Sequence, residues 1–417
     1  MLQDNIKRII IENQKLIHSK SLISRDINIP NTNSITVLIG IRRCGKTYTL
    51  YEKAQNFPKE DILFLDFEDE RLLILNTLNN YDIIIDSYKS IYPDKKPILF
   101  FDEIQNLKNW HLYLKRLHVQ DYKIYVTGSN AQMLSSEIAT FLKGRSLETK
   151  IYPFSFPEFL KLKQVSLSKS DIISNQAKIQ YLFDEYMKYG GFPDVIKAEK
   201  SHKRIIAQNI YNLLFYKDLI AKYHKNDYLL KLVVNKIVEN ITKEFSTSSL
   251  AKKIISIYKT SIPTINEYLS ILPEPFLSSN IYKYKQSFIE RQSKRKTYLT
   301  DNSFIFLNRV TNDYSRLFEN LVFTYLQRKY DELYYYKTSN GKEVDFYIHT
   351  PHKKLLIQVS YSIENSETKQ REITSLLKAM KELEVSDAYI YTYNYSETIE
   401  IENKQIIVLP FWKTILK

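Results

Sequence analysis

Short, continuous apolar runs alternate along the N-terminal part of the chain with stretches whose apolar residues recur at helical spacing. The apolar runs have the length of buried strands, and they cover residues 35–39, 61–67, 97–103 and 123–127. Helical periodicity marks residues 4–20 before the first run and residues 109–117 between the last two. Because strands alternate with helices, the pattern predicts an α/β fold with a parallel sheet.

The pattern changes after residue 158, and helical periodicity then continues to about residue 240. Gly190-Gly191 and Pro193 interrupt it. We expect backbone geometry to be their role, since glycine adopts left-handed conformations and proline stops a helix. The next helix is expected over residues 205–222, and its aromatic side chains are expected to pack a helical domain rather than stack on bases.

Residues 246–271 resemble the helix-turn-helix of a winged-helix domain, with the first helix in the stretch Ser248–Ile254 and the second starting near Pro263-Thr264. The second helix has no Arg or Lys between Pro263 and Leu269, which argues against base recognition by that helix. The basic stretch behind it either grips phosphates as a wing or forms a solvated hairpin edge. Its basic residues are Lys283, Lys285, Arg291, Lys294, Arg295 and Lys296.

The composition is that of a globular chain with surplus positive charge. Of 417 residues 44% are hydrophobic, and 60 Lys and Arg stand against 47 Asp and Glu, a net charge of +13. This surplus favours a polyanionic partner, DNA first, although a lysine-rich surface is the competing explanation. The single cysteine, Cys44, excludes an internal disulfide. With no signal-peptide order and no membrane-spanning apolar run, we expect a cytoplasmic protein without a membrane partner.

Residues 40–47 read G-x-x-x-x-G-K-T directly after the first apolar run, which is the sequence and the context of a phosphate-binding loop. Glycines let the backbone turn tightly and direct its N–H groups at phosphate oxygens, while Lys46 contacts the β- and γ-phosphates and Thr47 binds Mg²⁺. The sequence therefore predicts a site for ATP and Mg²⁺. Its expected nucleotide contacts are Gly40, Arg42, Arg43, Cys44, Gly45, Lys46, Thr47 and Tyr48.

The third apolar run ends in Asp102 and Glu103, at the strand edge where parallel α/β sheets bind nucleotides. Asp102 is expected to hold Mg²⁺ with the loop threonine, and Glu103 to orient and deprotonate the attacking water. Ser129 and Asn130 follow the fourth run, with Thr127 behind them. They are candidate contacts to the γ-phosphate or the water, and an ordinary turn is the alternative.

In their order along the chain, these motifs resemble a group of prokaryotic AAA+ ATPases. The similarity rests on residues 40–47, 100–105 with Trp110, 127–130, 142–145 and 152–159. In that group a winged-helix segment and a C-terminal domain related to restriction-endonuclease-like nucleases follow the ATPase. The resemblance implies a P-loop AAA+ core over 1–150, a helical lid over 151–240, a winged-helix-like segment over 241–297 and a nuclease-like α/β domain over 298–417.

The family pattern marks Arg145 as an arginine that reaches a nucleotide phosphate, in its own subunit or in a neighbour's. The competing interpretation is a surface salt bridge. By the same analogy a homo-oligomer, such as a ring, is an expected assembly.

A nuclease of the PD-(D/E)xK class needs an Asp at one strand end and an acid-x-Lys on the next strand, so that two carboxylates hold Mg²⁺ and the Lys orients water. Asp345 meets the first requirement, but Gln358 and Ser360 stand in place of the second acid and the Lys. Gln358 still offers a metal its carbonyl oxygen. Glu319 is a candidate helix acid and Lys369 a candidate replacement cation. We expect a decayed nuclease fold that serves binding or assembly.

The leading functional interpretation is Mg²⁺-dependent ATP binding and hydrolysis coupled to DNA binding or remodelling. A nucleotide-gated signalling switch that binds a protein partner through the C-terminal domain is the main alternative. An ATP-driven nuclease is the third.

Overall fold

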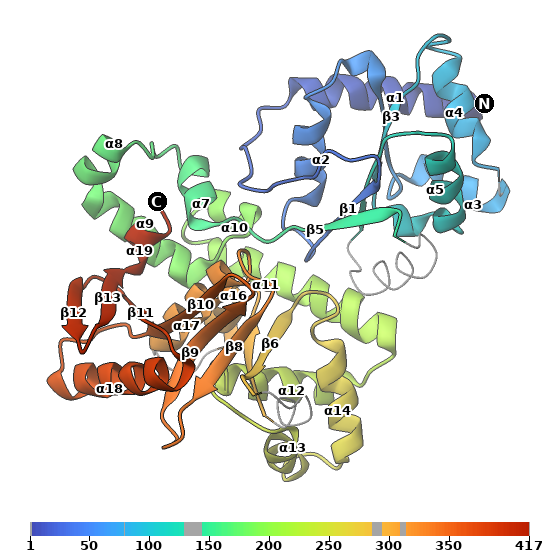
Figure 1. Cartoon of the computed structure of the whole chain (residues 1–417). Coiled ribbons are helices and arrows are strands. Elements are labelled where there is room, and N and C mark those ends of the chain that lie inside the picture. Colours follow the sequence, from blue (N-terminus) through green and yellow to red (C-terminus); the bar gives the residue numbers. More distant parts are fainter. Residues whose placement is uncertain (1, 79, 129–143, 286–293, 309–313, 417) are drawn as a thin grey trace. The chain divides into compact units, whose positions relative to one another are not determined.

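The computed structural model describes residues 2–78, 80–128, 144–285, 294–308 and 314–416, and it divides into two compact units (Figure 1). Unit 1 contains Met1–Pro153 with Glu274–Phe276, and unit 2 contains Phe154–Pro273 with Leu277–Lys417. Throughout the described ranges, every helix is too short or not apolar enough to span a membrane.

Unit 1 is built on a parallel sheet of five strands in the order β2-β3-β4-β1-β5. The strands are β1 (Ile35–Ile39), β2 (Ile62–Asp66), β3 (Ile98–Asp102), β4 (Ile124–Gly128) and β5 (Ser146–Lys150). The four apolar runs are therefore confirmed as strands. The order places β1 between β4 and β5, so the loop that leaves β1 starts from the interior of the sheet.

Strand β5 was not predicted from the sequence. It lies at the edge of the sheet and pairs only with β1 among the described strands. Thr149 is its one buried residue, and Leu147, Glu148 and Lys150 are exposed. An edge strand with so little burial lacks the apolar run on which strand prediction depends.

Helices cover the sheet of unit 1 and complete its core. The N-terminal helix α1 buries Ile6, Ile9 and Ile10 in the same apolar cluster as β1 to β4, and its Gln14 side chain donates a 2.8 Å hydrogen bond to the carbonyl of Ile62. The helices of this unit are α1 (Leu2–Ser19), α2 (Lys46–Ala54), η1 (Lys59–Asp61), η2 (Glu70–Leu72), α3 (Leu75–Leu78), α4 (Asp82–Lys89), η3 (Ile104–Asn106) and α5 (Trp110–Val119).

Unit 2 begins with a helical segment and then adds a mixed sheet. The expected helical pattern is confirmed, and residues 246–271 contain two helices as expected. The helices before the sheet are α7 (Phe156–Leu162), α8 (Lys169–Ser174), α9 (Gln176–Tyr189), α10 (Pro193–Lys197), α11 (Lys203–Leu213), the π-helix η5 (Leu214–Ala221), α12 (Asp227–Glu239), α13 (Thr247–Ile255) and α14 (Ile262–Ile271).

The sheet of unit 2 has eight strands in the described residues, in the order β12-β13-β11-β10-β9-β8-β6-β7. They are β6 (Ser278–Lys283), β7 (Arg295–Leu299), β8 (Leu333–Lys337), β9 (Glu343–Thr350), β10 (Lys353–Val359), β11 (Asp387–Thr392), β12 (Glu397–Ile401) and β13 (Lys404–Pro410). The helices that accompany it are α16 (Asn302–Asn308), α17 (Tyr314–Leu326), α18 (Ser366–Leu383) and α19 (Phe411–Thr414).

The hairpin expected to be a wing is part of this sheet. Strands β6 and β7 pair antiparallel, and β6 also pairs parallel with β8 through Tyr282 opposite Tyr334 and Lys283 opposite Tyr335. The expected boundary between residues 297 and 298 therefore falls inside β7. Sequence reasoning separated the two parts because β6 and β8 are far apart in the chain, and such non-local pairing leaves no local pattern.

The helical segment packs on the helices beside this sheet, since α9 and α11 both contact α16. Tyr211 of α11 meets Phe304 of α16 edge to face, with ring centroids 5.7 Å apart, and stacks on Phe215 at the same centroid distance. The prediction that these aromatics pack protein rather than bases is confirmed by these contacts.

Gly190 and Gly191 join the helical segment to the residues that precede α16. The N–H of Gly191 donates a 2.7 Å hydrogen bond to the buried carboxylate of Asp301. Gly190 has φ 74° and ψ −163°, a conformation that only glycine adopts readily. A Cβ on Gly190 would lie 1.7 Å from Asp301 Oδ1. Gly190 is therefore required both for the turn and for the approach of Asp301.

We expect Gly190→Ala to destabilise unit 2 by about 3 kcal/mol or more, because strain in φ adds to the displacement of a buried, hydrogen-bonded carboxylate. Gly341→Ala is the matched control, since Gly341 has φ 81° with no heavy atom within 4 Å of an added Cβ. It should cost only about 1 kcal/mol. Urea unfolding followed by circular dichroism measures both. Equal losses would show that the contact with Asp301 is unimportant.

Candidate functional site

The loop between β1 and α2 owes its shape to two glycines. Gly45 has φ 102° and caps α2, which begins at Lys46. A Cβ on Gly40 would lie 2.1 Å from the carbonyl oxygen of Ile151, so the backbone of Gly40 packs where no side chain fits. The loop therefore opens onto the N-terminus of α2, the geometry in which backbone N–H groups bind phosphate.

The other predicted loop contacts differ in exposure. Arg42 lies 3.9 Å from Glu68 through its guanidinium, whereas Arg43 and Tyr48 are exposed. Cys44 is completely buried, and burial raises the pKa of its thiol. Cys44 therefore packs the loop and contributes its backbone rather than a reactive sulfur.

Arg25 holds the loop from outside, and sequence reasoning missed it. Its guanidinium donates to the carbonyl of Cys44 at 3.2 Å and to the carbonyl of Tyr152 at 2.8 Å. It therefore ties the loop to the segment that follows β5. It precedes β1 without a recognisable motif, so only the folded chain identifies it.

Lys46 is 5% exposed and its ammonium lies within the loop. It donates to the carbonyl oxygens of Gly40 at 3.1 Å and Ile41 at 3.4 Å, and it lies 3.9 Å from Glu103 Oε1. The predicted phosphate-binding lysine and the predicted water-activating carboxylate therefore face each other.

Asp102 is held by two hydroxyl groups. Thr127 at the end of β4 donates to its carboxylate and accepts a 3.0 Å hydrogen bond from the N–H of Glu103. Thr47 also hydrogen-bonds Asp102. Burial raises the pKa of Asp102, and these two hydrogen bonds act in the opposite direction. The structure therefore brings the two predicted Mg²⁺ ligands, Thr47 and Asp102, into contact.

Glu103 adopts a left-handed backbone conformation, with φ 47°. Gln105 donates a 2.5 Å hydrogen bond to its carboxylate. Of the three candidates at the end of β4, the structure shows Thr127 in contact with both predicted acids. Ser129 and Asn130 lie outside the described residues.

Asp66 is a third acid at this sheet edge, and sequence reasoning did not select it. It is the last residue of β2 and stands in register with Asp102. Burial, with the negative charges of Asp102, Glu68 and Glu103, raises the pKa of Asp66 to about 6, although a hydrogen bond from the backbone N–H of Glu68 lowers it. Its position at the end of an apolar run could have identified it, because the carboxyl ends of parallel strands lie at the same edge of the sheet.

The described residues contain no group of three or more His, Cys, Asp or Glu side chains arranged to hold a metal by themselves. This fits a nucleotide-linked Mg²⁺, which takes one or two protein ligands together with phosphate oxygens and waters. Thr47 and Asp102 supply a hydroxyl and a carboxylate, the donors that this ion prefers.

Arg145 lies near the start of β1, whereas the phosphate loop leaves the other end of that strand. It precedes β5, whose first residue Ser146 pairs with Ile35 at the start of β1, and its carbonyl accepts a 2.8 Å hydrogen bond from Ile35 N–H. The length of β1, roughly 16 Å at 3.3 Å per residue, separates it from the phosphate loop. Arg145 is therefore not placed to contact a phosphate in its own subunit.

In unit 2, Asp345 on β9 and Gln358 on β10 come together as predicted. Gln358 Oε1 accepts a 3.3 Å hydrogen bond from the N–H of Asp345. Lys369, the candidate replacement cation, does not join them, and neither does Ser360, which stands in place of the lysine. Ser360 donates to the carbonyl of Ser362 at 2.9 Å, and Lys369 pairs with Glu397 at 2.5 Å.

Lys296 of β7, expected to be a wing residue, is the cation beside Asp345, at 3.1 Å from its Oδ1. Glu319 is 3.3 Å from the same ammonium. Burial raises the pKa of Glu319 to about 7, although Lys296 lowers it, and Asp345 adds to the increase. The predicted helix acid is therefore confirmed as a neighbour of Asp345, while the lysine comes from an unexpected strand.

The other basic residues of the hairpin also have internal contacts. Lys294 pairs with Glu244 at 2.9 Å, and the guanidinium of Arg295 lies 5.5 Å from the ring centroid of Phe245. Arg291 lies outside the described residues. The prediction of a phosphate-gripping wing is therefore wrong for Lys296 and lacks support at Lys294 and Arg295.

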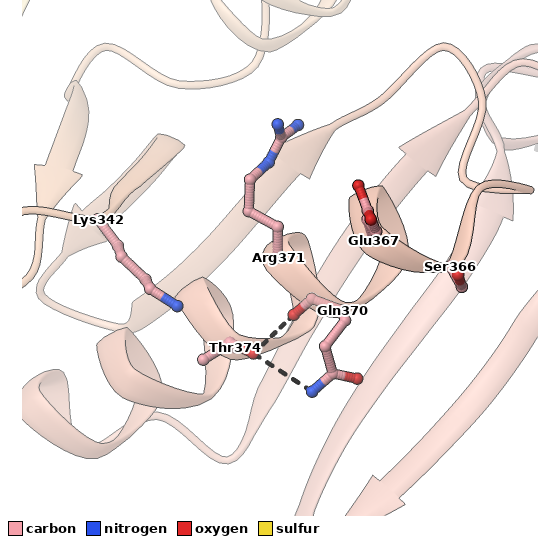
Figure 2. Close-up of a pocket in the computed structure, with 6 residues that line it drawn as sticks. All are labelled: Lys342, Ser366, Glu367, Gln370, Arg371 and Thr374. Carbon is pink, nitrogen blue, oxygen red and sulfur yellow. Dashed lines mark hydrogen bonds between the residues drawn. The ribbon is translucent and has the colours of Figure 1, made fainter.

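A pocket of about 510 Å³ lies on the outer face of α18 (Figure 2). Figure 2 shows Lys342 pointing towards the helix face that carries Thr374, and Arg371 pointing away from it. Arg371 pairs with Glu372 at 2.6 Å, and Glu372 hydrogen-bonds Gln358. The pocket residues are Lys342, Ser366, Glu367, Gln370, Arg371 and Thr374. Neither Asp345 nor Glu319 lines this pocket.

We expect Asp66→Asn to stabilise the nucleotide-free protein at pH 7.5. The ordinary pKa of 3.8 rises to about 6 in the fold, so the folded state keeps a proton that the unfolded state releases, and wild-type stability falls as pH rises from about 4 to 6. The advantage of Asp66→Asn should disappear near pH 4. Urea unfolding across pH in EDTA measures this, with exposed Asp94→Asn as control. A less stable Asp66→Asn at pH 7.5 would overturn the prediction.

Three parts of the chain match known protein families. Residues 32–160 match an AAA domain, residues 180–313 a domain of unknown function, DUF8612, and residues 314–413 another, DUF4143. The Walker-type ATPase PABY2304 of Pyrococcus abyssi aligns with 74% of this chain and 95% of its own, at 15% identity and a TM-score of 0.45.

Full-length relatives are also similar to this chain. An uncharacterized protein of Haemophilus influenzae is 30% identical over 414 residues, which are 94% of this chain and 99% of the relative. Uncharacterized protein MJ1544 of Methanocaldococcus jannaschii is 34% identical over 424 residues, covering 98% of this chain and 94% of the relative. The chain therefore belongs to the family of MJ1544, and its N-terminal unit is an AAA-type P-loop domain.

Proposed function

We propose that the protein binds ATP with Mg²⁺ and hydrolyses it, and that this cycle is coupled to DNA binding or remodelling. The observation that carries the first part is the contact of Thr47 and Thr127 with Asp102, beside Lys46 and Glu103. These residues belong to a loop and a strand edge of an AAA domain, and together they form the groups that phosphoryl transfer to water requires.

Each residue has a separate task in this proposal. The loop N–H groups and Lys46 bind the phosphates and stabilise charge that develops on them. Thr47 and Asp102 hold Mg²⁺, which neutralises phosphate charge when bound. Glu103 accepts the proton of the attacking water. Thr127 fixes Glu103 through its backbone, and Gln105 holds the carboxylate until ATP is bound.

Two observations support coupling to DNA. The chain carries a net charge of +13, and the consecutive helices α13 and α14 contact each other in the segment that resembles a winged-helix domain. The exposed face of α14 carries Glu267, paired with Lys225, and no Arg or Lys. Contact through phosphates rather than base edges is therefore the expected mode.

Arg145 enters the proposal only through assembly. Because it lies away from the loop of its own chain, a role at a phosphate requires a neighbouring subunit. A homo-oligomer in which Arg145 meets the loop of the next copy is the corresponding arrangement.

A nucleotide-gated switch that binds a protein through unit 2 is the second candidate. The internal contacts of the hairpin favour it, because Lys296 is buried and Lys294 is paired with Glu244, which leaves less free positive charge for DNA to contact. In this case ATP turnover would be slow and indifferent to DNA.

We expect Lys46→Ala to abolish nucleotide binding and Glu103→Gln to bind ATP while turnover falls by about 100-fold or more. A fluorescent ATP analogue measures binding and phosphate release measures turnover, both with Mg²⁺. Lys89→Ala, which removes an exposed lysine from α4, is the matched charge control. Turnover of Glu103→Gln equal to wild type would remove Glu103 from the role of base.

DNA coupling predicts that single-stranded, duplex or branched DNA raises the steady-state ATPase rate, with Lys46→Ala as the blank. Binding to that DNA should weaken steeply between 50 and 200 mM salt, as counterion release requires. ATP turnover that no form of DNA changes, together with a flat salt response, would favour the protein-binding switch.

A further inference from the structure

Lys296 is a buried lysine surrounded by carboxylates. It extends from β7 and is 1% exposed. Its ammonium lies 2.8 Å from Glu343 Oε1, 3.1 Å from Asp345 Oδ1 and 3.3 Å from Glu319 Oε1. Of these carboxylates, Glu319 of α17 and Asp345 of β9 accept hydrogen bonds from the ammonium, and Glu343 of β9 forms an ion pair with it.

The carboxylates are oriented towards Lys296 by further contacts. Tyr298 donates a 2.8 Å hydrogen bond to Glu319 Oε1, and the N–H of Val359 donates to Asp345 Oδ2 at 3.0 Å. Lys337 lies 3.6 Å from Glu343 Oε2. Both oxygens of Asp345 are therefore engaged without a metal.

Gln358 is engaged in the same way. Its carbonyl accepts from the N–H of Asp345, and its side chain hydrogen-bonds Glu372. The side-chain oxygen of Gln358 is therefore hydrogen-bonded to the backbone of the neighbouring strand. For Gln358 to coordinate a metal, this contact would have to break.

Buried carboxylates need a positive charge close by, since desolvation of an unpaired charge costs several kcal/mol. In a metal-dependent nuclease a divalent cation meets that need. Here the ammonium of Lys296 already lies at the point where Glu319, Glu343 and Asp345 converge.

We propose that Lys296 is the built-in cation of this cluster: it occupies the place of a divalent metal, excludes that metal, and fastens β7 to β9 and α17. The domain that contains the eight-stranded sheet of unit 2 is then a structural and binding domain that needs no metal. This inference concerns unit 2 alone and does not depend on ATP hydrolysis in unit 1.

The test is metal binding by the full chain without nucleotide. Wild type should bind no Mn²⁺ at this cluster, so Asp345→Asn should leave its Mn²⁺ titration unchanged. Lys296→Met leaves three carboxylates without their cation, so its melting temperature should fall in EDTA and recover by several degrees with Mn²⁺. Its Mn²⁺ affinity should exceed that of wild type by about tenfold or more.

Lys294→Met is the matched control, because Lys294 lies in the same hairpin but its side chain is 59% exposed. It should gain no Mn²⁺ dependence. Asp102→Asn identifies any Mn²⁺ that binds in unit 1. If Lys296→Met fails to fold, the wild-type and Asp345→Asn titrations decide the question alone.

Two results would overturn the inference. One is Mn²⁺ binding by the wild type that Asp345→Asn abolishes. The other is metal-dependent nicking of plasmid DNA by the wild type that Lys296→Met, shown to be folded, no longer catalyses. The second result would make Lys296 the lysine of an active nuclease.

Discussion

The phosphate loop depends on a close backbone approach between Gly40 and Ile151. The carbonyl of Ile151 occupies the space that a side chain at position 40 would need. The N–H of Ile151 donates a 2.7 Å hydrogen bond to the carbonyl of Ile39. Arg25 adds two further ties, to Cys44 and Tyr152. The shape of the loop therefore depends on the chain beyond β5, and an edge strand with one buried residue carries much of the geometry of the site.

The two polar centres of the molecule solve the same electrostatic problem differently. At the ends of β2 and β3, Asp66 is partly buried beside the buried Asp102, and partial burial together with neighbouring negative charges raises the pKa of Asp66. That arrangement suits a cation that arrives with a ligand. In unit 2 the cation is covalently part of the chain, as Lys296. An ammonium that belongs to the chain neutralises the carboxylates at all times, but the site cannot then exchange it for a metal ion.

Much of unit 1 could be predicted because its signals are local. The strand that precedes the phosphate loop and the strand that ends in Asp102 are continuous apolar runs, and the loop motif by itself indicates phosphate binding. Thr127 was ranked behind Ser129 and Asn130 because local order along a strand end does not show which side chain turns inward. The role of Lys296 could not be read locally, since its partners Glu319 and Asp345 lie 23 and 49 residues away.

The membership of β6 and β7 in the C-terminal sheet determines where the chain can be divided. A recombinant fragment starting at residue 298 would lack β6 and most of β7, including Lys296. It would leave the edge of β8 unpaired, with its backbone N–H and C=O groups open to another chain, and Asp345 and Glu319 would lose the ammonium of Lys296. Such a fragment should aggregate, whereas one that starts before β6 keeps the sheet edge covered.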